Sequence, residues 1–178
     1  MISVGITGRK GRGKNTVTNY LKEKYGYVEL SFAGPLKRGC KEMFGLDDNQ
    51  LETYKDVVDN YWGIPPRLMF QYQGTEVARD MYKNIIPELG ENFWIKRLYK
   101  DLNSEDHFAI SDCRFPNEVQ ALKEKGFIII RINSDVYKGS GLYENHPSET
   151  QIDTLDVDFD VYNNGTKEEL FKQIDALI

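Results

Sequence analysis

The chain has 178 residues, 40% of them hydrophobic, and a formal net charge of −5, which is ordinary for one soluble globular domain. The acidic balance argues against general binding to nucleic acid or anionic membranes, and no apolar run approaches the ~20 residues of a membrane span. Cys40 and Cys113 lie far apart without metal-ligand spacing. Together with an N-terminus unlike a signal peptide, they predict free thiols and a cytoplasmic protein.

The first part of the chain alternates between strand and helix patterns. Ile2–Ile6 is a short β-rich run that leads into a glycine-rich segment. Lys14–Tyr25 then carries apolar residues on one helical face, and Tyr27–Phe32 alternates as a strand. This order predicts a strand, a loop, a helix and a second strand.

Helical patterns fill the next part, about 34–105. They are Pro35–Phe44, Leu51–Asn60, a longer helix opened by Pro65 and Pro66 and reaching about Tyr82, and Asn92–Leu102. Asp47 followed by Gln50 resembles a capping box at the start of the second helix. The whole block is longer than one crossover between strands needs, so it is predicted to form a separate helical region beside the sheet.

Strand patterns return in the last part of the chain. The predicted strands are Phe108–Ser111, Phe127–Ile132 and Phe159–Tyr162, with helices at Pro116–Lys125 and after a Thr166-x-x-Glu169 capping box. The three consecutive isoleucines suit a central strand buried on both faces. Strands that alternate with helices predict an α/β fold with a parallel sheet.

The segment Gly8-x-x-x-x-Gly13-Lys14 has the spacing of a phosphate-binding P-loop. Its glycines allow backbone N–H groups to converge on phosphate oxygens, and the lysine adds a mobile positive charge. The following helix directs its N-terminal dipole at the same anion. The alternative, a solvated turn rich in Gly, Arg and Lys, would not require this spacing.

One position departs from the usual P-loop pattern. The Ser or Thr that normally ligates Mg²⁺ after the lysine is replaced by Asn15, with Thr16 next. We expect Mg²⁺ to screen the nucleotide phosphates, with Asn15 and Asp112 as metal-site candidates that act directly or through a bound water.

The stretch FAISDCRFPNE, residues 108–118, forms a second candidate site. Ligands of open α/β sheets gather at the carboxyl ends of strands, which places Asp112 to hold a metal-bound water and Arg114 to bind a second phosphate. An aspartate helix cap followed by a surface arginine explains the same letters, and this stretch alone does not decide between the two.

The helical region carries polar residues at mostly three- or four-residue spacing. These are Arg67, Gln71, Thr75, Glu76 and Arg79, with Trp94 nearby. Arginines bind phosphates bidentately, and Gln, Thr and Glu can recognise a base edge or a sugar. A solvated helix face with ordinary ion pairs is the alternative, and the pattern alone slightly favours it.

Together, these motifs resemble those of the viral and bacteriophage deoxynucleoside monophosphate kinases. The matching stretches are GITGRKGRGKNT, SFAGPLK, QGTEVARD, FW, ISDCRFPNE, HPSE and NNGTKEEL, which occur in the family's order and span nearly the whole chain. The P-loop is common to very many NTPases, whereas SDCRFPNE, HPSE and NNGT are much more specific. Asn15 is a mild departure, because the family commonly has an acidic residue there.

The resemblance implies a single P-loop NTPase domain of three layers, with a five-stranded parallel sheet flanked by helices. Its core would be 1–33 and 106–178, with a mainly helical acceptor-binding region at about 34–105 and a short lid at about 133–148. It implies transfer from ATP, with Mg²⁺, to a deoxynucleoside 5′-monophosphate, giving the diphosphate and ADP for DNA precursor synthesis. The implied location is the cytoplasm, that of the host for a viral protein. No nucleic acid polymer and no membrane are implied as partners, and a homodimer is left open.

The resemblance also assigns site residues by their positions in these motifs. The catalytic candidates are Lys14, Asp112, Arg114 and Arg131. The donor-nucleotide candidates are Gly8, Arg9, Lys10, Gly11, Arg12, Gly13, Lys14, Asn15, Thr16, Asn164 and Gly165. The acceptor-binding candidates are Lys37, Arg67, Gln71, Thr75, Glu76, Arg79, Trp94, Asp112 and Arg114.

Two other functions remain open from the sequence. A P-loop kinase for another small phosphorylated metabolite, of the phosphomevalonate or dephospho-CoA type, would share the donor site but lack a base-recognising pocket. A non-catalytic nucleotide-binding module would bind ATP without transferring a phosphoryl group, and a single-turnover transfer to a monophosphate would exclude it.

Overall fold

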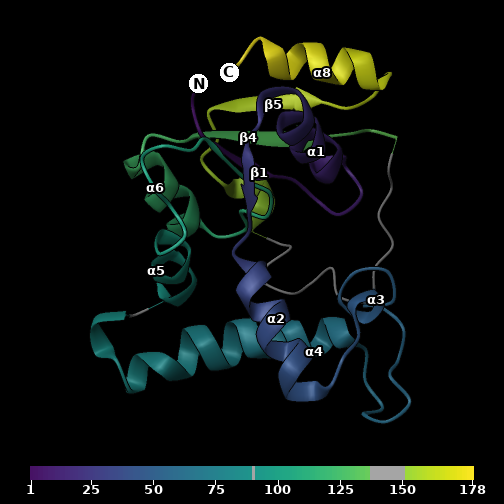
Figure 1. Ribbon diagram of the computed structural model, residues 1–178, viewed down its shortest axis with the longest axis vertical. Helices are drawn as coiled ribbons and strands as arrows, with labels where there is room; N and C mark the ends of the chain where they lie inside the picture. The colour runs from purple at the N-terminus through teal and green to yellow at the C-terminus, as the bar shows by residue number, and fades with distance from the viewer. Residues whose placement is uncertain (90, 137–150) are drawn as a thin grey trace. The chain divides into compact units, whose positions relative to one another are not determined.

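The computed structural model describes residues 1–89, 91–136 and 151–178. The chain divides into two units (Figure 1). The first unit contains Met1–Ser31 and Asp101–Ile178, and the second contains Phe32–Lys100. Residues 137–148 of the predicted lid lie outside the described residues.

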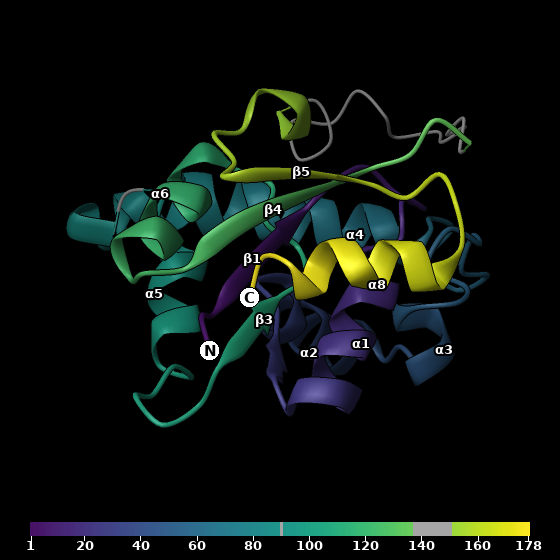
Figure 2. The same ribbon diagram turned by 90° about the horizontal axis from the view of Figure 1, so that it is seen from above.

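The first unit is built on a five-stranded sheet in which all neighbouring strands run parallel. The strands are β1 (Val4–Thr7), β2 (Val28–Leu30), β3 (Phe108–Ile110), β4 (Ile128–Asn133) and β5 (Phe159–Tyr162). Their order across the sheet is β2-β3-β1-β4-β5, and Figure 2 shows β3, β1, β4 and β5 side by side. The predicted α/β fold with a five-stranded parallel sheet is confirmed. Because β1 is central, the loop that follows it emerges from the middle of the sheet.

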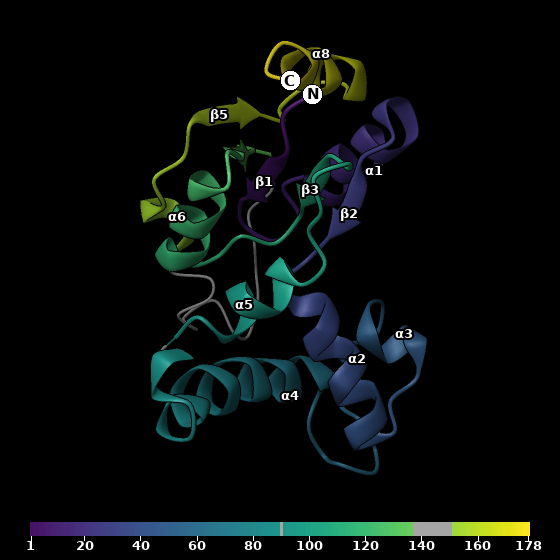
Figure 3. The same ribbon diagram turned by 60° about the vertical axis from the view of Figure 1, so that its left-hand side comes forward.

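Helices cover both faces of this sheet (Figure 3). Helices α1 (Lys14–Tyr25) and α8 (Lys167–Asp175) pack on the face where Val4 and Ile6 of β1 point. The opposite face contacts α6 (Pro116–Glu124), because a Cβ atom on Gly5 would lie 3.0 Å from the side chain of Leu122. The alternation along β1 therefore divides the core into two layers around the sheet.

The isoleucines of β4 occupy the middle of this core. Ile129, Ile130 and Ile132 are fully buried, as the prediction of a strand covered on both faces requires. Burial of large aliphatic side chains at each of these positions stabilises the fold by roughly 1.5–3 kcal/mol per side chain. The carboxyl end of β4 is thereby fixed next to that of β1, with which it pairs from Val4 to Thr7.

Helix α8 is joined to α1 by a polar and aromatic contact. The rings of Tyr20 and Phe171 stack with centroids 3.8 Å apart. The carboxylate of Asp175 accepts hydrogen bonds from the Tyr20 hydroxyl at 2.6 Å and the Tyr25 hydroxyl at 2.9 Å. A capping box between Thr166 and Glu169 begins α8, as the sequence predicts. The helix that follows the glycine-rich loop is thus supported by the last helix of the chain.

The second unit is helical. Its elements are α2 (Ala33–Phe44), α3 (Asp48–Leu51), α4 (Pro66–Tyr72), the π-helix η1 (Gln73–Met81), the short 3₁₀ helices η2 (Tyr82–Asn84) and η3 (Pro87–Leu89), and α5 (Phe93–Tyr99). Helix α2 packs across α4 and η1 (Figure 1). A small core of Cys40, Leu46, Leu51, Met69 and Phe70 holds α2, α3 and α4 together.

The predicted helix Leu51–Asn60 is wrong beyond its first residue. The capping box of Asp47 and Gln50 is present, but α3 ends at Leu51. The backbone beyond it finds partners outside any helix: the Asp59 N–H donates to the carbonyl of Ile64 at 3.1 Å. The Asp59 carboxylate accepts from two further backbone N–H groups, and these contacts form a turn in place of the helix.

The long helix predicted from Pro66 to about Tyr82 is confirmed, with a change of winding at Gln73. The indole N–H of Trp94 donates to the carbonyl of Gly74 at 2.8 Å. This side chain competes for a carbonyl that an α-helix would use, and such insertions are a recognised cause of irregular winding. Gly74 also allows α2 to approach, because a Cβ atom there would lie 2.8 Å from the side chain of Leu36.

Candidate functional site

The glycine-rich loop between β1 and α1 has a backbone that only glycine adopts readily. Gly8 has φ +138° and Gly13 has φ +103°. A Cβ atom would lie 2.5 Å from the Ile132 carbonyl oxygen at Gly8, and 2.5 Å from the side-chain amide of Asn163 at Gly13. Conformation and close packing therefore both select glycine at these positions. Gly13 directly precedes α1, so the loop ends at a helix N-terminus, where anions bind favourably.

Lys14, the first residue of α1, reaches back over this loop. Its ammonium group donates to the carbonyl oxygens of Gly8 at 2.6 Å and Arg9 at 2.9 Å. Asn15 is exposed and Thr16 is partly buried at the start of the same helix. The structure thus places a mobile cation and two side chains with oxygen donors beside the same loop.

The segment 112–114 lies beside the start of the loop. The Cys113 N–H donates to the Ile6 carbonyl at 3.1 Å, and the Thr7 hydroxyl donates to the Cys113 carbonyl at 2.7 Å. Because Thr7 directly precedes Gly8, these two bonds bring the segment that carries Asp112 and Arg114 to the loop. Burial raises the pKa of the Cys113 thiol, so this cysteine acts as an apolar packing residue.

Glu118 fixes the backbone of this segment and was not predicted. Its buried carboxylate accepts from the backbone N–H groups of Arg114 at 2.9 Å and Phe115 at 3.1 Å. The N-cap position of α6 is occupied by Phe115. The alternative interpretation of Asp112 as a helix cap is therefore wrong. The sequence feature that could have identified Glu118 is its position as an acidic residue in the first turn of a helix that begins at Pro116.

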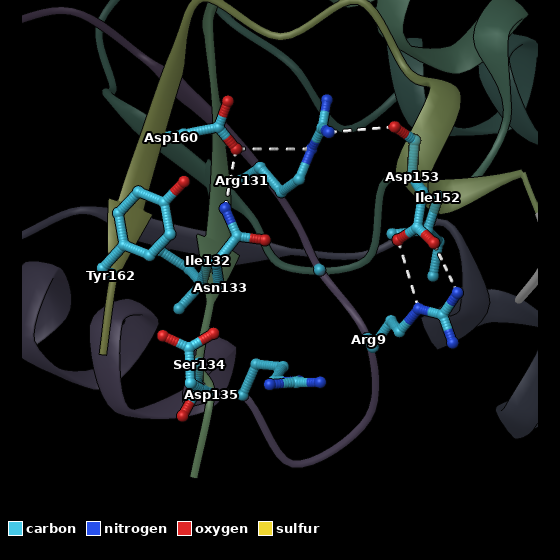
Figure 4. Close-up of a pocket in the computed structure, with 12 residues that line it drawn as sticks. Arg9, Arg131, Ile132, Asn133, Ser134, Asp135, Ile152, Asp153, Asp160 and Tyr162 are labelled. Atoms are coloured by element: carbon cyan, nitrogen blue, oxygen red, sulfur yellow. Dashed lines mark hydrogen bonds and ion pairs between the residues drawn. The ribbon is translucent and has the colours of Figure 1, made fainter. Parts of the chain in front are cut away.

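A pocket of about 350 Å³ opens between the loop and the ends of β4 and β5 (Figure 4). It is lined by Gly8, Arg9 and Arg12 from the loop, Arg131, Ile132, Asn133, Ser134 and Asp135 from β4 and its end, Asp160 and Tyr162 from β5, and Ile152 and Asp153 from η4 (Ile152–Thr154). Of the predicted site residues, it brings together Gly8, Arg9, Arg12 and Arg131. Asn133 and Tyr162 were missed, although strand ends are where ligands of such sheets bind.

Two of the arginines of this pocket, Arg9 and Arg131, contact acidic residues or carbonyl groups of its wall. Arg9 contacts Asp153 through both Nε and Nη2, with Nε 3.1 Å from Oδ1, and this hydrogen bond and charge hold the pKa of Asp153 below its usual range. Arg131 donates to the carbonyl oxygens of Asp153 at 2.9 Å and Leu155 at 2.6 Å, and its Nε lies 3.7 Å from Asp160. Arg9 and Arg131 are thus oriented by acidic and carbonyl groups at the pocket wall (Figure 4).

The residues after β5 contact the loop from the far end of the chain. The Asn163 side chain donates to the Arg12 carbonyl at 2.9 Å. Asn164, the predicted neighbour, pairs instead with Asp135 through two hydrogen bonds of 2.8 and 2.7 Å. Asn163 therefore supports the loop directly, while Asn164 ties β5 to the segment that follows β4.

The predicted acceptor residues, apart from Asp112 and Arg114, lie in the second unit. Arg79 is buried and donates to the Glu91 carbonyl at 3.4 Å, which overturns the slightly favoured view of a solvated helix face. One oxygen of Glu76 is also buried and, in the described part of the chain, has no hydrogen-bond partner. Trp94 is buried with its N–H bound to Gly74, so its visible contacts are those of a packing residue.

No group of three or more His, Cys, Asp or Glu side chains arranged to hold a metal occurs in the described ranges. In the same ranges, no helix has the length and apolar character to cross a membrane.

Comparisons with known proteins agree with the resemblance seen in the motifs. The family model for deoxynucleotide monophosphate kinase matches residues 44–174. A protein of Acanthamoeba polyphaga mimivirus assigned to these kinases is 39% identical over 185 residues, covering 98% of this chain and 94% of its own. The deoxynucleotide monophosphate kinases of Enterobacteria phage T4 and Escherichia phage RB69 are 25% and 23% identical, and the matches cover 59% and 53% of the phage proteins.

Solved structures with a similar arrangement include dephospho-CoA kinase from Campylobacter jejuni and shikimate kinase from Bacteroides thetaiotaomicron. Their TM-scores are 0.48 and 0.43, with 15% and 12% identity, over 98% and 99% of this chain and 96% of each of theirs. The assignment rests on the sequence comparisons, which span most of the chain at up to 39% identity. The chain belongs to the deoxynucleotide monophosphate kinase family.

Proposed function

We propose that this kinase uses ATP, with Mg²⁺, to phosphorylate a deoxynucleoside 5′-monophosphate. The main support for the donor site is the loop that contains Gly8 and Gly13, where a side chain at either glycine would clash with its neighbours. The loop ends at the N-terminus of α1, and the ammonium group of Lys14 donates to the carbonyl oxygen of Gly8 within it. Such a loop binds a chain of phosphates through its N–H groups. The 350 Å³ pocket beside it accommodates further parts of the donor.

Cationic side chains perform the chemistry in this proposal. The acceptor is already an anionic phosphate, so the reaction needs alignment and charge stabilisation rather than a strong general base. Lys14 stabilises charge on the donor phosphates, and Arg114, placed beside the loop by the bonds of Cys113, binds the transferring group. Arg131, at the end of β4, contributes from the pocket side.

The residues near the loop fit Mg²⁺ by their chemistry. The metal prefers oxygen ligands and is commonly held by one or two carboxylates together with substrate phosphates. Asp112 offers a carboxylate beside the loop, and Asn15 and Thr16 offer oxygens at the start of α1. When bound, the ion neutralises charge on the donor phosphates.

The acceptor side is assigned to the second unit. Lys37 and Arg67 supply charge for the acceptor phosphate, and Gln71, Thr75, Glu76 and Arg79 supply polar groups along α4 and η1. The buried oxygen of Glu76, for which the described residues offer no hydrogen-bond partner, supports this assignment, because burying such an oxygen is costly unless another group donates to it. An amino group on a base is a donor of the required kind.

The deciding experiment is a coupled ADP-release assay with ATP and Mg²⁺ and each common deoxynucleoside and nucleoside monophosphate in turn. ADP release should depend on a deoxynucleoside monophosphate and should stop when the metal is chelated. ADP release that is the same with and without any monophosphate would reject phosphoryl transfer to this class of acceptor.

Substitution of Arg114 tests its role as a phosphate-binding fork. Arg114→Ala should lower kcat, and Arg114→Lys should restore activity only in part, because a planar guanidinium binds phosphate bidentately and an ammonium does not. Steady-state kinetics of both variants measure the effect, and thermal denaturation checks that the two variants are equally stable. If Arg114→Lys works at the wild-type rate, Arg114 contributes only general positive charge.

A further inference from the structure

A cluster of three cations lies in the second unit, and one member was not expected from the motifs. Lys37 comes from α2, Lys55 from the segment between α3 and α4, and Arg67 from the first turn of α4. The Arg67 N–H donates to the Lys55 carbonyl at 2.8 Å, which fixes this segment against α4. Lys55 is therefore brought to the two cations that the family resemblance assigns to the acceptor.

Two carboxylates bridge these cations. One oxygen of Glu52 contacts the Lys37 ammonium at 2.5 Å, and the other lies 3.6 Å from the Lys55 ammonium. Asp56 contacts Arg67 through both of its oxygens, with Nη2 3.2 Å from Oδ2. Each carboxylate thus presents its pair of oxygens to the cations as a phosphate would.

In this cluster the positively charged side chains are more buried than the carboxylates that contact them. The side chains of Lys37, Lys55 and Arg67 are only 25%, 26% and 15% exposed, whereas those of Glu52 and Asp56 are 61% and 43% exposed. The cations form the floor and the carboxylates lie on the solvent side. Three positive charges face two negative ones, so one unit of positive charge remains in a chain whose net charge is −5.

The electrostatics of Lys55 indicate an incomplete site. Burial, and then the charge of Lys37, lower the pKa of Lys55, Arg67 adds to this, and Glu52 and Asp56 offset only part of the effect. The binding of another anion would stabilise the charged form of a lysine in such surroundings. Groups whose pKa is perturbed by burial and by specific neighbouring charges cluster at functional sites.

We propose that Lys55 binds the phosphate group of the acceptor together with Lys37 and Arg67, and that Glu52 is an exchangeable counter-ion that the phosphate displaces. The inference rests on the proposed function, because it names a further residue of the acceptor site. A deoxynucleoside monophosphate brings up to two negative charges to a floor of three cations. A neutral deoxynucleoside brings none and gains nothing from Lys55.

The first test compares a deoxynucleoside monophosphate with its own deoxynucleoside by isothermal titration calorimetry. The monophosphate used is the one that wild-type enzyme phosphorylates best. Lys55→Gln should weaken binding of the monophosphate about tenfold, the loss expected for one charged hydrogen bond, and leave binding of the nucleoside unchanged. Lys41→Gln is the matched control, because Lys41 is another lysine of the second unit, on α2, and forms an ion pair with Asp48 outside the cluster. It should change neither affinity.

The second test reverses the sign. Glu52→Gln removes the competing anion, so it should lower KM for the monophosphate several-fold and leave KM for ATP unchanged. A purely structural bridge between Lys37 and Lys55 predicts the opposite, since its loss would loosen the site. Glu52 is exposed, so the substitution leaves the core intact.

The outcomes separate the two proposals. If wild-type enzyme neither binds nor phosphorylates a deoxynucleoside monophosphate, the proposed function fails before any variant is made. If wild type is active but Lys55→Gln binds the monophosphate normally, or loses nucleoside binding equally, the phosphate role of Lys55 is overturned. A raised KM for the monophosphate in Glu52→Gln would reject the exchangeable counter-ion.

Discussion

Lys14→Ala should reduce kcat by at least ~10²-fold while the protein remains folded, by analogy with the loss of one preorganised electrostatic donor. Lys14 begins α1, and its ammonium group lies against the carbonyl oxygens of Gly8 and Arg9. Lys14 is not one of the buried core residues that stabilise the sheet. Steady-state kinetics with saturating ATP and monophosphate measure the effect, and thermal denaturation checks the fold. If the variant turned over at a near-normal rate, the assignment of the glycine-rich loop to the catalytic site would be rejected.

Gly8→Ala should destabilise the protein and abolish activity together. Alanine would have to adopt φ +138° with its Cβ atom 2.5 Å from the Ile132 carbonyl oxygen, and that backbone cannot move without breaking β4. Strain and overpacking together are expected to cost about 2–6 kcal/mol. Denaturant unfolding monitored by circular dichroism gives the free energy of unfolding, and ADP release gives the activity.

Gly26→Ala is the matched control for Gly8. Gly26 also has a positive φ, +72°, but an added Cβ atom there would meet nothing within 4 Å. Its substitution should cost about 1–2 kcal/mol for the left-handed backbone alone, with activity unchanged. Equal losses at Gly8 and Gly26 would show that conformation, and not close packing of the loop against β4, determines the requirement for glycine.

The sequence predicted the elements whose signals are local. The glycine spacing of the loop, the three consecutive isoleucines in β4 and the capping box of Thr166 and Glu169 each identify their structure within a few residues. Amphipathic patterning and cap chemistry are short-range effects, so they are visible in a single sequence. The parallel sheet followed from the alternation of these elements.

The predictions that were wrong depended on distant partners. The helix expected through Asn60 ends at Leu51, because the backbone of Asp59 bonds to Ile64 and that of Lys55 to Arg67. The burial of Arg79 is equally invisible to helical periodicity, and its partner, the Glu91 carbonyl, lies outside its own helix. Tertiary contacts override local propensity at such positions.

Within the candidate site, the sequence indicated which kinds of side chain are present better than it indicated which residues they contact. Asn164 was expected to bind the donor nucleotide, which remains a prediction, whereas its neighbour Asn163, which was not predicted, contacts the loop. Successive residues of an extended chain project to opposite sides, so Asn164 pairs with Asp135 instead. Neither Lys55 nor Glu52 belongs to any of the motifs recognised in the sequence. Their proximity to Lys37 arises from the turn that replaces the predicted helix.

The bond between Asn163 and the carbonyl of Arg12 joins residues 151 positions apart. Such a contact requires a long loop of chain to be closed, which costs conformational entropy and slows folding. During synthesis, the N-terminal loop therefore emerges well before the residues that shape it. A nascent chain that still lacks residues 159–178 has every glycine of the loop but neither β5 nor α8 beside it. We therefore expect its capacity to bind nucleotide to develop only after β5 and α8 have been synthesised.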